Sequence, residues 1–152
     1  MTDRQRIYLD TSVISALLDH RNPERMELTK EFMASSDIYD IYISEITTAE
    51  LERTPDEHLR AAMKSAIHDF QVLPGTDDGA LLAEEYIRNG AIPESHPEDA
   101  YHIAIAVLAN IGFLLSWNFK HIVRLKTRRI VQTVNASRGL SQINILTPAE
   151  ML

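Results

Sequence analysis

The sequence contains no cysteine among its 152 residues. This absence excludes a disulfide framework, a thiol nucleophile and a cysteine-based zinc site. Long apolar runs are also missing, because the longest, residues 103–115, includes Asn110 and is too short to cross a bilayer. The first residues, MTDRQRIYLD, lack the apolar stretch of a signal peptide. We therefore expect a soluble cytoplasmic protein without a membrane segment.

No internal repeat, low-complexity segment or linker rich in proline, glycine or serine divides the chain. Apolar residues make up 45% and charged residues 24% of the sequence, which is typical of a globular protein rather than a disordered one. The length suits one domain with a substantial core. We expect a single domain over residues 1–152.

The net charge of −7 is unevenly distributed along the chain. Residues 1–99 carry 21 acids and 9 bases, whereas residues 100–152 carry 1 acid and 6 bases. Such an asymmetry can bind polyanions that the net charge alone would repel, although a solvated basic helix explains it equally well. The basic residues of the second part are Lys120, Arg124, Lys126, Arg128, Arg129 and Arg138.

Short apolar runs alternate with helical patterns along the whole chain. The runs predict strands at residues 7–9, 38–43, 72–75, 113–115 and 143–146. Helices are predicted near 11–18 (capped by Thr11 or Ser12), 22–35, 44–53, 54–70, 76–89, 97–110 and 126–137. Because the strands are apolar without strict alternation, we expect a mainly parallel sheet of about five strands between helices, a three-layer α/β/α fold.

Polar side chains follow the strands at the edge where such sheets carry their functional groups. Asp10 ends the first strand, Glu50 lies in the helix after the second, and Asp99 opens the most apolar helix. Asn118 follows the fourth strand. Clustered carboxylates need a cation, and oxygen ligands suit Mg²⁺ or Mn²⁺. Phosphodiester hydrolysis is the natural chemistry of such a site.

The stretches around these residues resemble those of PIN-domain ribonucleases, most closely the VapC-type toxins of toxin–antitoxin pairs. The resemblance covers essentially the whole chain, and its motifs occur in the family's order and approximate spacing. They are YLDTSVI at 8–14, ITTAEL at 46–51, PEDAYHIA at 97–104, LLSWNFKH at 114–121 and LTPAE at 146–150.

The resemblance implies a PIN-like fold and a Mg²⁺- or Mn²⁺-dependent endoribonuclease that uses a metal-activated water. Asp10, Glu50 and Asp99 match the family's three principal acids. The family usually has aspartate where this chain has Asn118, and an amide supplies an oxygen but no charge. The resemblance also implies an RNA substrate, a cognate antitoxin protein and a homodimer. The apolar side chains within residues 13–32 offer a surface that the antitoxin or a second copy of the chain would cover.

Each candidate residue also has a purely structural interpretation. Asp10 could simply cap a helix, and Asn118 could be a turn residue. Asp99 could favour the helix dipole, a role for which Glu98 competes. Thr11 and Ser116 are candidates for holding the carboxylates or their waters, or for local caps. His102 and Trp117 are expected to be packed residues, and the scattered histidines give no zinc pattern.

Two other functions remain open at this point. Because Asn118 replaces the usual aspartate, one alternative is a catalytically weakened PIN module that binds RNA or protein. A haloacid-dehalogenase-type phosphatase would need a second aspartate where Ser12 stands, and a receiver domain would need an acid pair at the first strand, so both fit poorly.

Overall fold

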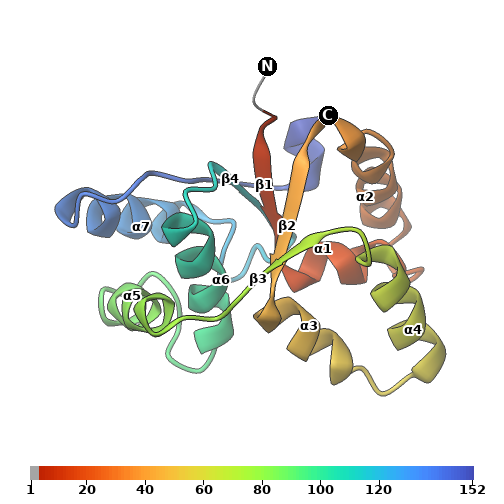
Figure 1. Ribbon diagram of the computed structural model, residues 1–152, viewed down its shortest axis with the longest axis horizontal. Coiled ribbons are helices and arrows are strands. Elements are labelled where there is room, and N and C mark those ends of the chain that lie inside the picture. Colours follow the sequence, from red (N-terminus) through yellow and green to blue (C-terminus); the bar gives the residue numbers. More distant parts are fainter. Residues whose placement is uncertain (1–3) are drawn as a thin grey trace.

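The computed structural model describes residues 4–152, which are built around one parallel β-sheet with helices on both faces (Figure 1). The strand order is β3-β2-β1-β4-β5, and every neighbouring pair is parallel. The strands are β1 (Arg6–Leu9), β2 (Asp40–Ser44), β3 (Gln71–Leu73), β4 (Phe113–Leu115) and β5 (Asn144–Leu146). The predicted α/β/α architecture with a parallel central sheet is confirmed.

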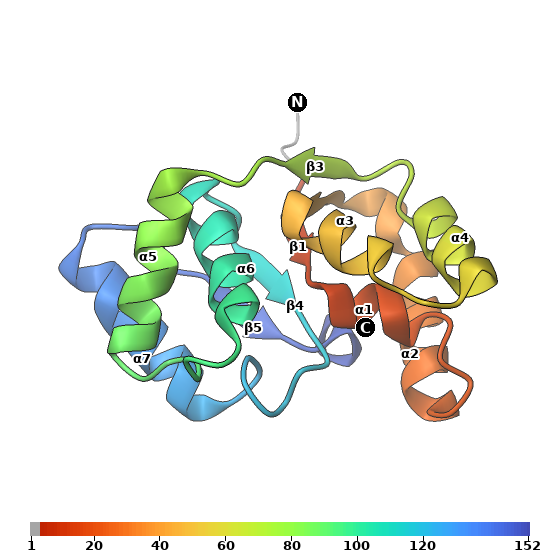
Figure 2. The ribbon, with the colours of Figure 1, turned by 90° about the horizontal axis from the view of Figure 1, so that it is seen from below.

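Figure 2 shows the two helical layers on either side of the sheet. One layer contains α1 (Thr11–Ala16), α2 (Pro23–Ala34), α3 (Glu45–Glu52) and α4 (Glu57–Ala66). The other contains α5 (Asp77–Arg88), α6 (Pro97–Leu108) and α7 (Leu125–Ser137). Two 3₁₀ helices, η1 (Ser36–Ile38) and η2 (Pro148–Met151), complete the described elements.

The central strand β1 separates two hydrophobic cores. Tyr8 packs into the core beneath α5, α6 and α7, while Ile7 and Leu9 pack into the core beneath α1 to α4. Successive side chains of a strand point to opposite faces of the sheet. Because helices cover both faces, all three side chains are fully buried. This explains why β1 is apolar without alternation, as expected for a strand covered on both sides.

Helix ends mostly follow the predicted signals, with one correction. The side chain of Asn22 caps α2 by accepting from the backbone N–H of Arg25, and Thr76 caps α5 in the same way. Gly90, at a φ of +85°, follows the end of α5. The predicted cap of α1 at Thr11 or Ser12 is wrong, because Asp10 is the residue whose side chain accepts from Val13 N–H.

Some element boundaries also differ from the sequence prediction, and β3 spans Gln71–Leu73 rather than residues 72–75. The second strand begins at Asp40 rather than residue 38, because residues 36–38 form η1 and leave Ile38 exposed. Helix α4 ends at Ala66, and residues 67–70 turn back toward β3. Most apolar residues of the first two helices lie in the core; these buried residues are Val13, Ile14, Met26 and Phe32.

Within residues 4–152, no helix combines the length and apolar character needed to cross a membrane.

Candidate active site

The predicted site residues meet at the carboxyl ends of the central strands. The strands β2 and β3 lie on one side of β1, and the later strands β4 and β5 lie on the other side. The topological switch point is therefore between β1 and β4. Open parallel sheets bind their ligands at this point. Asp10 directly follows β1, and Ser116 directly follows β4.

Asp10 is a buried carboxylate, with 3% of its surface exposed. Its Oδ1 accepts from the Ser12 hydroxyl at 2.6 Å and from Val13 N–H at 3.3 Å, while its Oδ2 accepts from the Ser116 hydroxyl at 2.6 Å. Burial raises the pKa of Asp10 in spite of these hydrogen bonds. Within residues 4–152, no lysine or arginine forms an ion pair with Asp10.

Glu50 projects from α3 and is held by His102 of α6. Its Oε1 lies 2.8 Å from His102 Nε2. His102 Nδ1 lies 2.6 Å from the Tyr8 hydroxyl, which lies 2.7 Å from the Ser44 hydroxyl. One direction of donation satisfies this buried chain with a neutral imidazole: Ser44 donates to Tyr8, Tyr8 to His102, and His102 Nε2–H to Glu50.

The pKa of Glu50 reflects two opposed influences. Partial burial by itself raises it, but the hydrogen bond from His102, helped by a hydrogen bond from Thr11 and the charge of Arg53, outweighs burial and holds the pKa below its ordinary value. Glu50 is therefore ionised at neutral pH and oriented by a residue that the sequence assigned only to packing.

Asp99 lies in the first turn of α6 and accepts two hydrogen bonds at its Oδ2. Asn118 Nδ2 donates at 3.2 Å, and His121 Nδ1 lies at 3.0 Å. Asn118 Oδ1 is already occupied, because it accepts from the backbone N–H of His121 at 2.9 Å. This contact fixes the orientation of the amide. Asn118 thus presents a donor to Asp99 and holds it in place.

These four side chains line a single cleft of about 390 Å³, which we call the carboxylate cleft. Thr11, predicted as a supporting residue, also lines it, and its hydroxyl lies 3.5 Å from His102 Nε2. The other predicted supporting residue, Ser116, donates to Asp10 and accepts from Asn118 N–H at 2.9 Å. Glu98 is exposed and does not line the cleft.

A divalent cation suits the chemistry of this donor set. Asp10, Glu50 and Asp99 offer carboxylate oxygens, the ligands that Mg²⁺ and Mn²⁺ prefer, and the buried charge of Asp10 needs a compensating cation. Within residues 4–152, however, no three histidine, aspartate or glutamate side chains form a ready-made ion site. Each carboxylate is held by its own hydroxyl, amide or imidazole partner, and its remaining lone pairs are available to an ion.

Sequence reasoning missed several residues at the site. Ser12, considered only as a helix cap, donates its hydroxyl to Asp10. His102 and His121 hold Glu50 and Asp99 through contacts between different elements, which no spacing in the sequence indicates. Asp19 adds another carboxylate to the cleft lining and pairs with Arg21 at 2.9 Å, an interaction that lowers the pKa of Asp19. Nothing in the sequence around Asp19 indicated this position.

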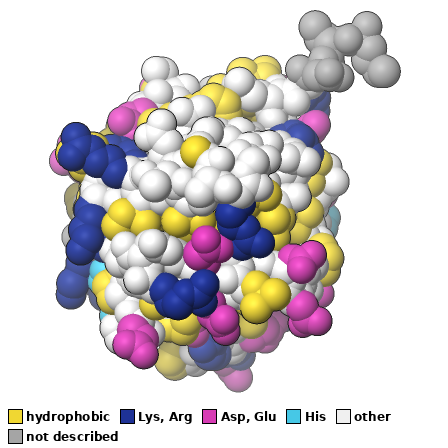
Figure 3. Space-filling model, turned by 90° about the vertical axis from the view of Figure 1, so that its left-hand side faces the viewer, with side chains coloured by type: hydrophobic (Ala, Val, Ile, Leu, Met, Phe, Trp, Pro, Cys, Tyr) yellow, Lys and Arg dark blue, Asp and Glu magenta, His cyan; other side chains and the backbone are white. Residues whose placement is uncertain are grey.

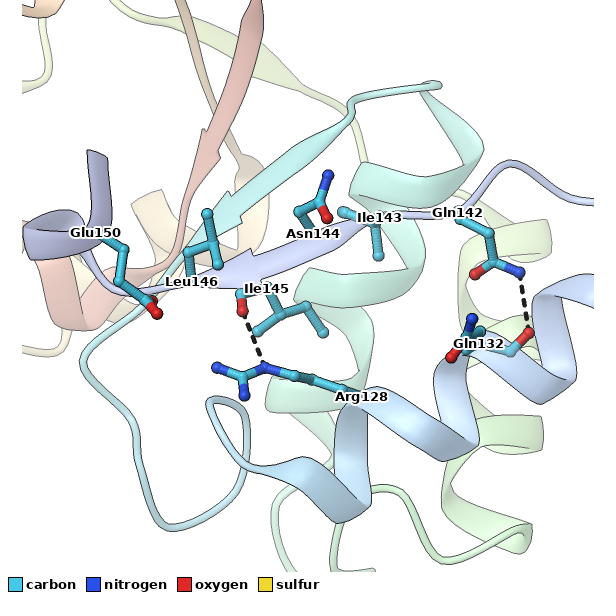
Figure 4. Close-up of a pocket in the computed structure, with 8 residues that line it drawn as sticks. All are labelled: Arg128, Gln132, Gln142, Ile143, Asn144, Ile145, Leu146 and Glu150. Atoms are coloured by element: carbon cyan, nitrogen blue, oxygen red, sulfur yellow. Dashed lines mark hydrogen bonds between the residues drawn. The ribbon is translucent and has the colours of Figure 1, made fainter. Parts of the chain in front are cut away.

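The basic residues of 120–138 do not all face solvent freely. Arg128 Nε donates to the carbonyl of Ile145 at 3.0 Å, in a second cleft between α7 and β5 (Figure 4). Arg124 donates to the carbonyl of Ala91, and Arg138 pairs with Glu85 at 2.7 Å.

Acids and bases are interspersed on the face shown in Figure 3, so no purely basic patch forms there. Lys120, Lys126 and Arg129 are exposed and have no hydrogen bond or ion pair through their side chains within residues 4–152.

Comparison with known proteins agrees with this geometry. The PIN domain family model matches residues 7–118, which include Asp10, Glu50, Asp99 and Asn118. A solved structure of Mycobacterium tuberculosis VapC20, described as a toxin that cleaves the sarcin–ricin loop, is similar in fold, with a TM-score of 0.59. The match covers 91% of this chain and 98% of VapC20, at 18% sequence identity. No curated protein matches the chain. A family model that spans most of the chain and its whole candidate site shows that this protein belongs to the PIN domain family.

Proposed function

We propose that this protein is a metal-dependent endoribonuclease and the toxin of a type II toxin–antitoxin pair. The observation that carries the proposal is the position of Asp10 at the switch point of the sheet, in one cleft with Glu50 and Asp99. Its carboxylate is buried and has no ion-paired lysine or arginine within residues 4–152. Buried carboxylates are costly unless they bind a cation, so their convergence indicates a functional site. Membership of the PIN family and the VapC-like fold support RNA as the substrate.

The residues of the cleft divide into ligands and supports. Asp10, Glu50 and Asp99 would hold Mg²⁺ or Mn²⁺. When bound, such an ion activates water for attack and stabilises negative charge on the phosphate. Ser12 and Ser116 orient Asp10, His102 orients Glu50, and Asn118 with His121 orients Asp99. These contacts reduce the freedom of the carboxylates before substrate arrives.

The direct test is cleavage of RNA by the purified chain with Mg²⁺, with Mn²⁺ and with EDTA. The panel contains a mixed RNA pool and an oligonucleotide with the sarcin–ricin loop sequence, because the similarly folded VapC20 is described as cleaving that loop. Asp10→Asn, prepared identically, is the control for contaminating nuclease. Metal-dependent cleavage by the wild type alone supports the proposal, and equal cleavage by both proteins shows contamination.

A catalytically weakened PIN module that binds RNA or protein is the second candidate. One observation favours it: Asn118 stands where the family usually has a fourth acid, and its amide donates to Asp99 instead of adding a charge. Isothermal titration with Mn²⁺ separates the candidates. Binding that Asp10→Asn abolishes supports the enzyme, whereas the absence of both binding and cleavage supports the binding module.

We also propose a cognate antitoxin and a homodimeric, cytoplasmic state, as for VapC-type proteins. Both follow from the family relationship rather than from a contact in this structure. Light scattering on the purified chain tests the dimer, and a strict monomer would remove it. Co-expression with the product of the adjacent reading frame, followed by copurification, tests the antitoxin.

A further inference from the structure

Three side chains form a cation–aromatic group beside the carboxylate cleft. Arg25 comes from α2, and Trp117 and Phe119 come from the segment after β4. The Arg25 guanidinium carbon lies over both rings, 5.2 Å from the Trp117 centroid and 5.6 Å from the Phe119 centroid. The two rings meet edge to face, with centroids 6.2 Å apart. Arg25 and Trp117 also line the cleft that contains the carboxylates, so the group is continuous with the site.

The two rings differ sharply in exposure. Trp117 is 7% exposed, and its indole N–H donates to the Thr29 hydroxyl at 2.9 Å, which ties it to α2. Phe119 is 51% exposed. Its backbone N–H donates to the Trp117 carbonyl at 3.0 Å, so the exposed ring is presented by a hydrogen-bonded turn. The buried ring and the guanidinium act as its support.

Exposure alone would not distinguish Phe119, because isolated apolar side chains on a surface are ordinary. Leu81 on α5 is exposed to a similar degree, 58%. Phe119 differs in its chemistry and location: it contacts Arg25 and Trp117, which line the carboxylate cleft, and the exposed Lys120 follows it.

A nucleobase fits this surface better than a protein side chain does. Bases of single-stranded RNA stack on aromatic rings and on arginine planes, while neighbouring cations bind the phosphates. A stable protein interface needs roughly 800 Å² on each partner, with an apolar centre depleted of charge. One exposed ring between Arg25 and Lys120 supplies neither the area nor the neutral surroundings.

We infer that Arg25, Trp117 and Phe119 form a stacking platform for one unpaired base of a single-stranded RNA, next to the carboxylate cleft. Phe119 supplies the stacking face, Arg25 adds cation–π attraction, and Trp117 keeps both in position. The inference rests on the proposed function, because the RNA substrate is what brings a base to this position. It adds a substrate contact outside the predicted metal ligands.

Binding of RNA in EDTA tests the platform without cleavage. The probes are a fluorescently labelled single-stranded RNA and a strand of equal length with abasic sugars throughout, followed by fluorescence anisotropy at low salt. Phe119→Ala should bind the base-containing strand about tenfold more weakly than the wild type, because a stacked base contributes on that order. Its affinity for the abasic strand should not change. Phe119→Tyr should retain wild-type affinity, and Leu81→Ala is the control for loss of an exposed apolar side chain.

Several outcomes would overturn the platform. One is that Phe119→Ala binds both strands as tightly as the wild type. Another is that its affinity falls equally for both strands, which would indicate that Phe119 acts in the fold or in the binding of phosphates. No measurable RNA binding by the wild type would also overturn it. Phe119→Ala that binds RNA normally but fails to copurify with an antitoxin would assign the ring to a protein interface. Thermal melting of each variant shows whether it is folded.

The platform and the nuclease can fail separately. Cleavage by the wild type with unchanged binding by Phe119→Ala removes the platform and leaves the enzyme. Base-dependent loss of affinity in Phe119→Ala without any metal-dependent cleavage keeps the platform and favours the RNA-binding module.

Discussion

Asp10 affects the stability of the fold in two opposite ways: its hydrogen bonds stabilise the start of α1, and its buried charge destabilises the folded state. Its carboxylate caps α1 and accepts two serine hydroxyls, yet it is buried without an ion-paired lysine or arginine in residues 4–152. A desolvated charge destabilises the folded state, and sites that bind ligands commonly lower stability in this way. The cost of the site is therefore concentrated in this residue.

Replacing Asp10 by asparagine should separate stability from activity. In EDTA, we expect Asp10→Asn to be more stable than the wild type by about 1–2 kcal/mol, because it removes the desolvated charge. Its amide oxygen can still cap α1, and the Ser116 hydroxyl can accept from the new amide while it donates to Ser12 Oγ, 3.3 Å away. Mn²⁺ should raise the melting temperature of the wild type but not of the variant. Scanning calorimetry measures both effects. Asp19→Asn, at a solvated position of the cleft, should gain no stability, and an Asp10→Asn protein no more stable than the wild type would contradict the argument.

The same charge gives a pH dependence of defined sign. Burial raises the pKa of Asp10 above its unfolded value, so the folded state holds the proton more strongly. Stability from this group is complete below the unfolded pKa and is lost as the pH rises through the folded pKa. The advantage of Asp10→Asn over the wild type should therefore grow from acid to neutral pH in metal-free denaturant titrations. An advantage that shrinks over this range would contradict it.

We expect Asn118 to influence both the stability of the metal-free protein and its affinity for an ion. In Asn118→Asp, the donor 3.2 Å from Asp99 becomes a second negative charge. We expect a lower melting temperature in EDTA, because like charges repel, and roughly tenfold tighter Mn²⁺ binding, because a charged ligand is added. Calorimetric melting and isothermal titration measure the two quantities. Asn118→Ala should lose stability without gaining affinity, and unchanged Mn²⁺ affinity in Asn118→Asp would place residue 118 outside the ion site.

At the scale of elements, one buried hydroxyl joins the segment between β4 and α7 to the elements around it. Thr127 Oγ1 lies 2.7 Å from the Ala91 carbonyl and 2.6 Å from the His121 carbonyl, and it accepts from Arg124 Nε at 2.8 Å. These contacts join α7 to the segment that carries Asn118 and His121, and to the loop before α6. The positions of Asn118 and His121, which hold Asp99, therefore depend on the first turn of α7.

Removing this hydroxyl should destabilise the protein and loosen the site together. We expect Thr127→Val to lose about 1–3 kcal/mol of stability, because buried hydrogen-bonding groups lose their partner while the volume stays similar. Thr127→Ser should keep most of the stability. Urea titration followed by the fluorescence of Trp117, the only tryptophan, measures both. Equal stability of Thr127→Val and the wild type would show that the hydroxyl does not hold this segment.

The sequence allowed most elements to be predicted because caps and apolar periodicity are local signals. Asn22 and Thr76 cap helices at the first residues of the predicted ranges, whereas the cap of α1 had three candidates, because Asp10, Thr11 and Ser12 are all good cap types. The carboxylates could be predicted from their positions at strand and helix ends. Their histidine partners could not, because the Glu50–His102 contact depends on how α3 and α6 pack.

At the scale of the whole molecule, the charge asymmetry along the chain does not become a simple basic face. Three of the six cations beyond residue 100, namely Arg124, Arg128 and Arg138, bind carbonyls or Glu85. Exposed cations without side-chain partners within residues 4–152 remain at Lys120, Lys126 and Arg129. RNA binding should therefore depend on few phosphate contacts and show a shallow salt dependence.

Lys120 is the cation expected to bind phosphate nearest the site, because it follows Phe119. Lys120→Ala should reduce the slope of log affinity against log salt by roughly 0.7, the value for one contact with a single strand. Anisotropy titrations of labelled RNA at several salt concentrations give this slope. Lys64→Ala, which removes a cation paired with Glu52, should leave it unchanged. A slope unaffected by Lys120→Ala would exclude this phosphate contact.

The three carboxylates of the cleft belong to three different layers of the fold. Glu50 comes from the α1–α4 layer, Asp99 from the α5–α7 layer, and Asp10 from the sheet between them. An ion held by all three would join both layers to the sheet at one point, so local opening of either layer would also break coordination. Mn²⁺ should then slow amide hydrogen exchange in α3 and α6 together, although these helices belong to different cores. The active site would thereby make the opening of the two halves one cooperative event.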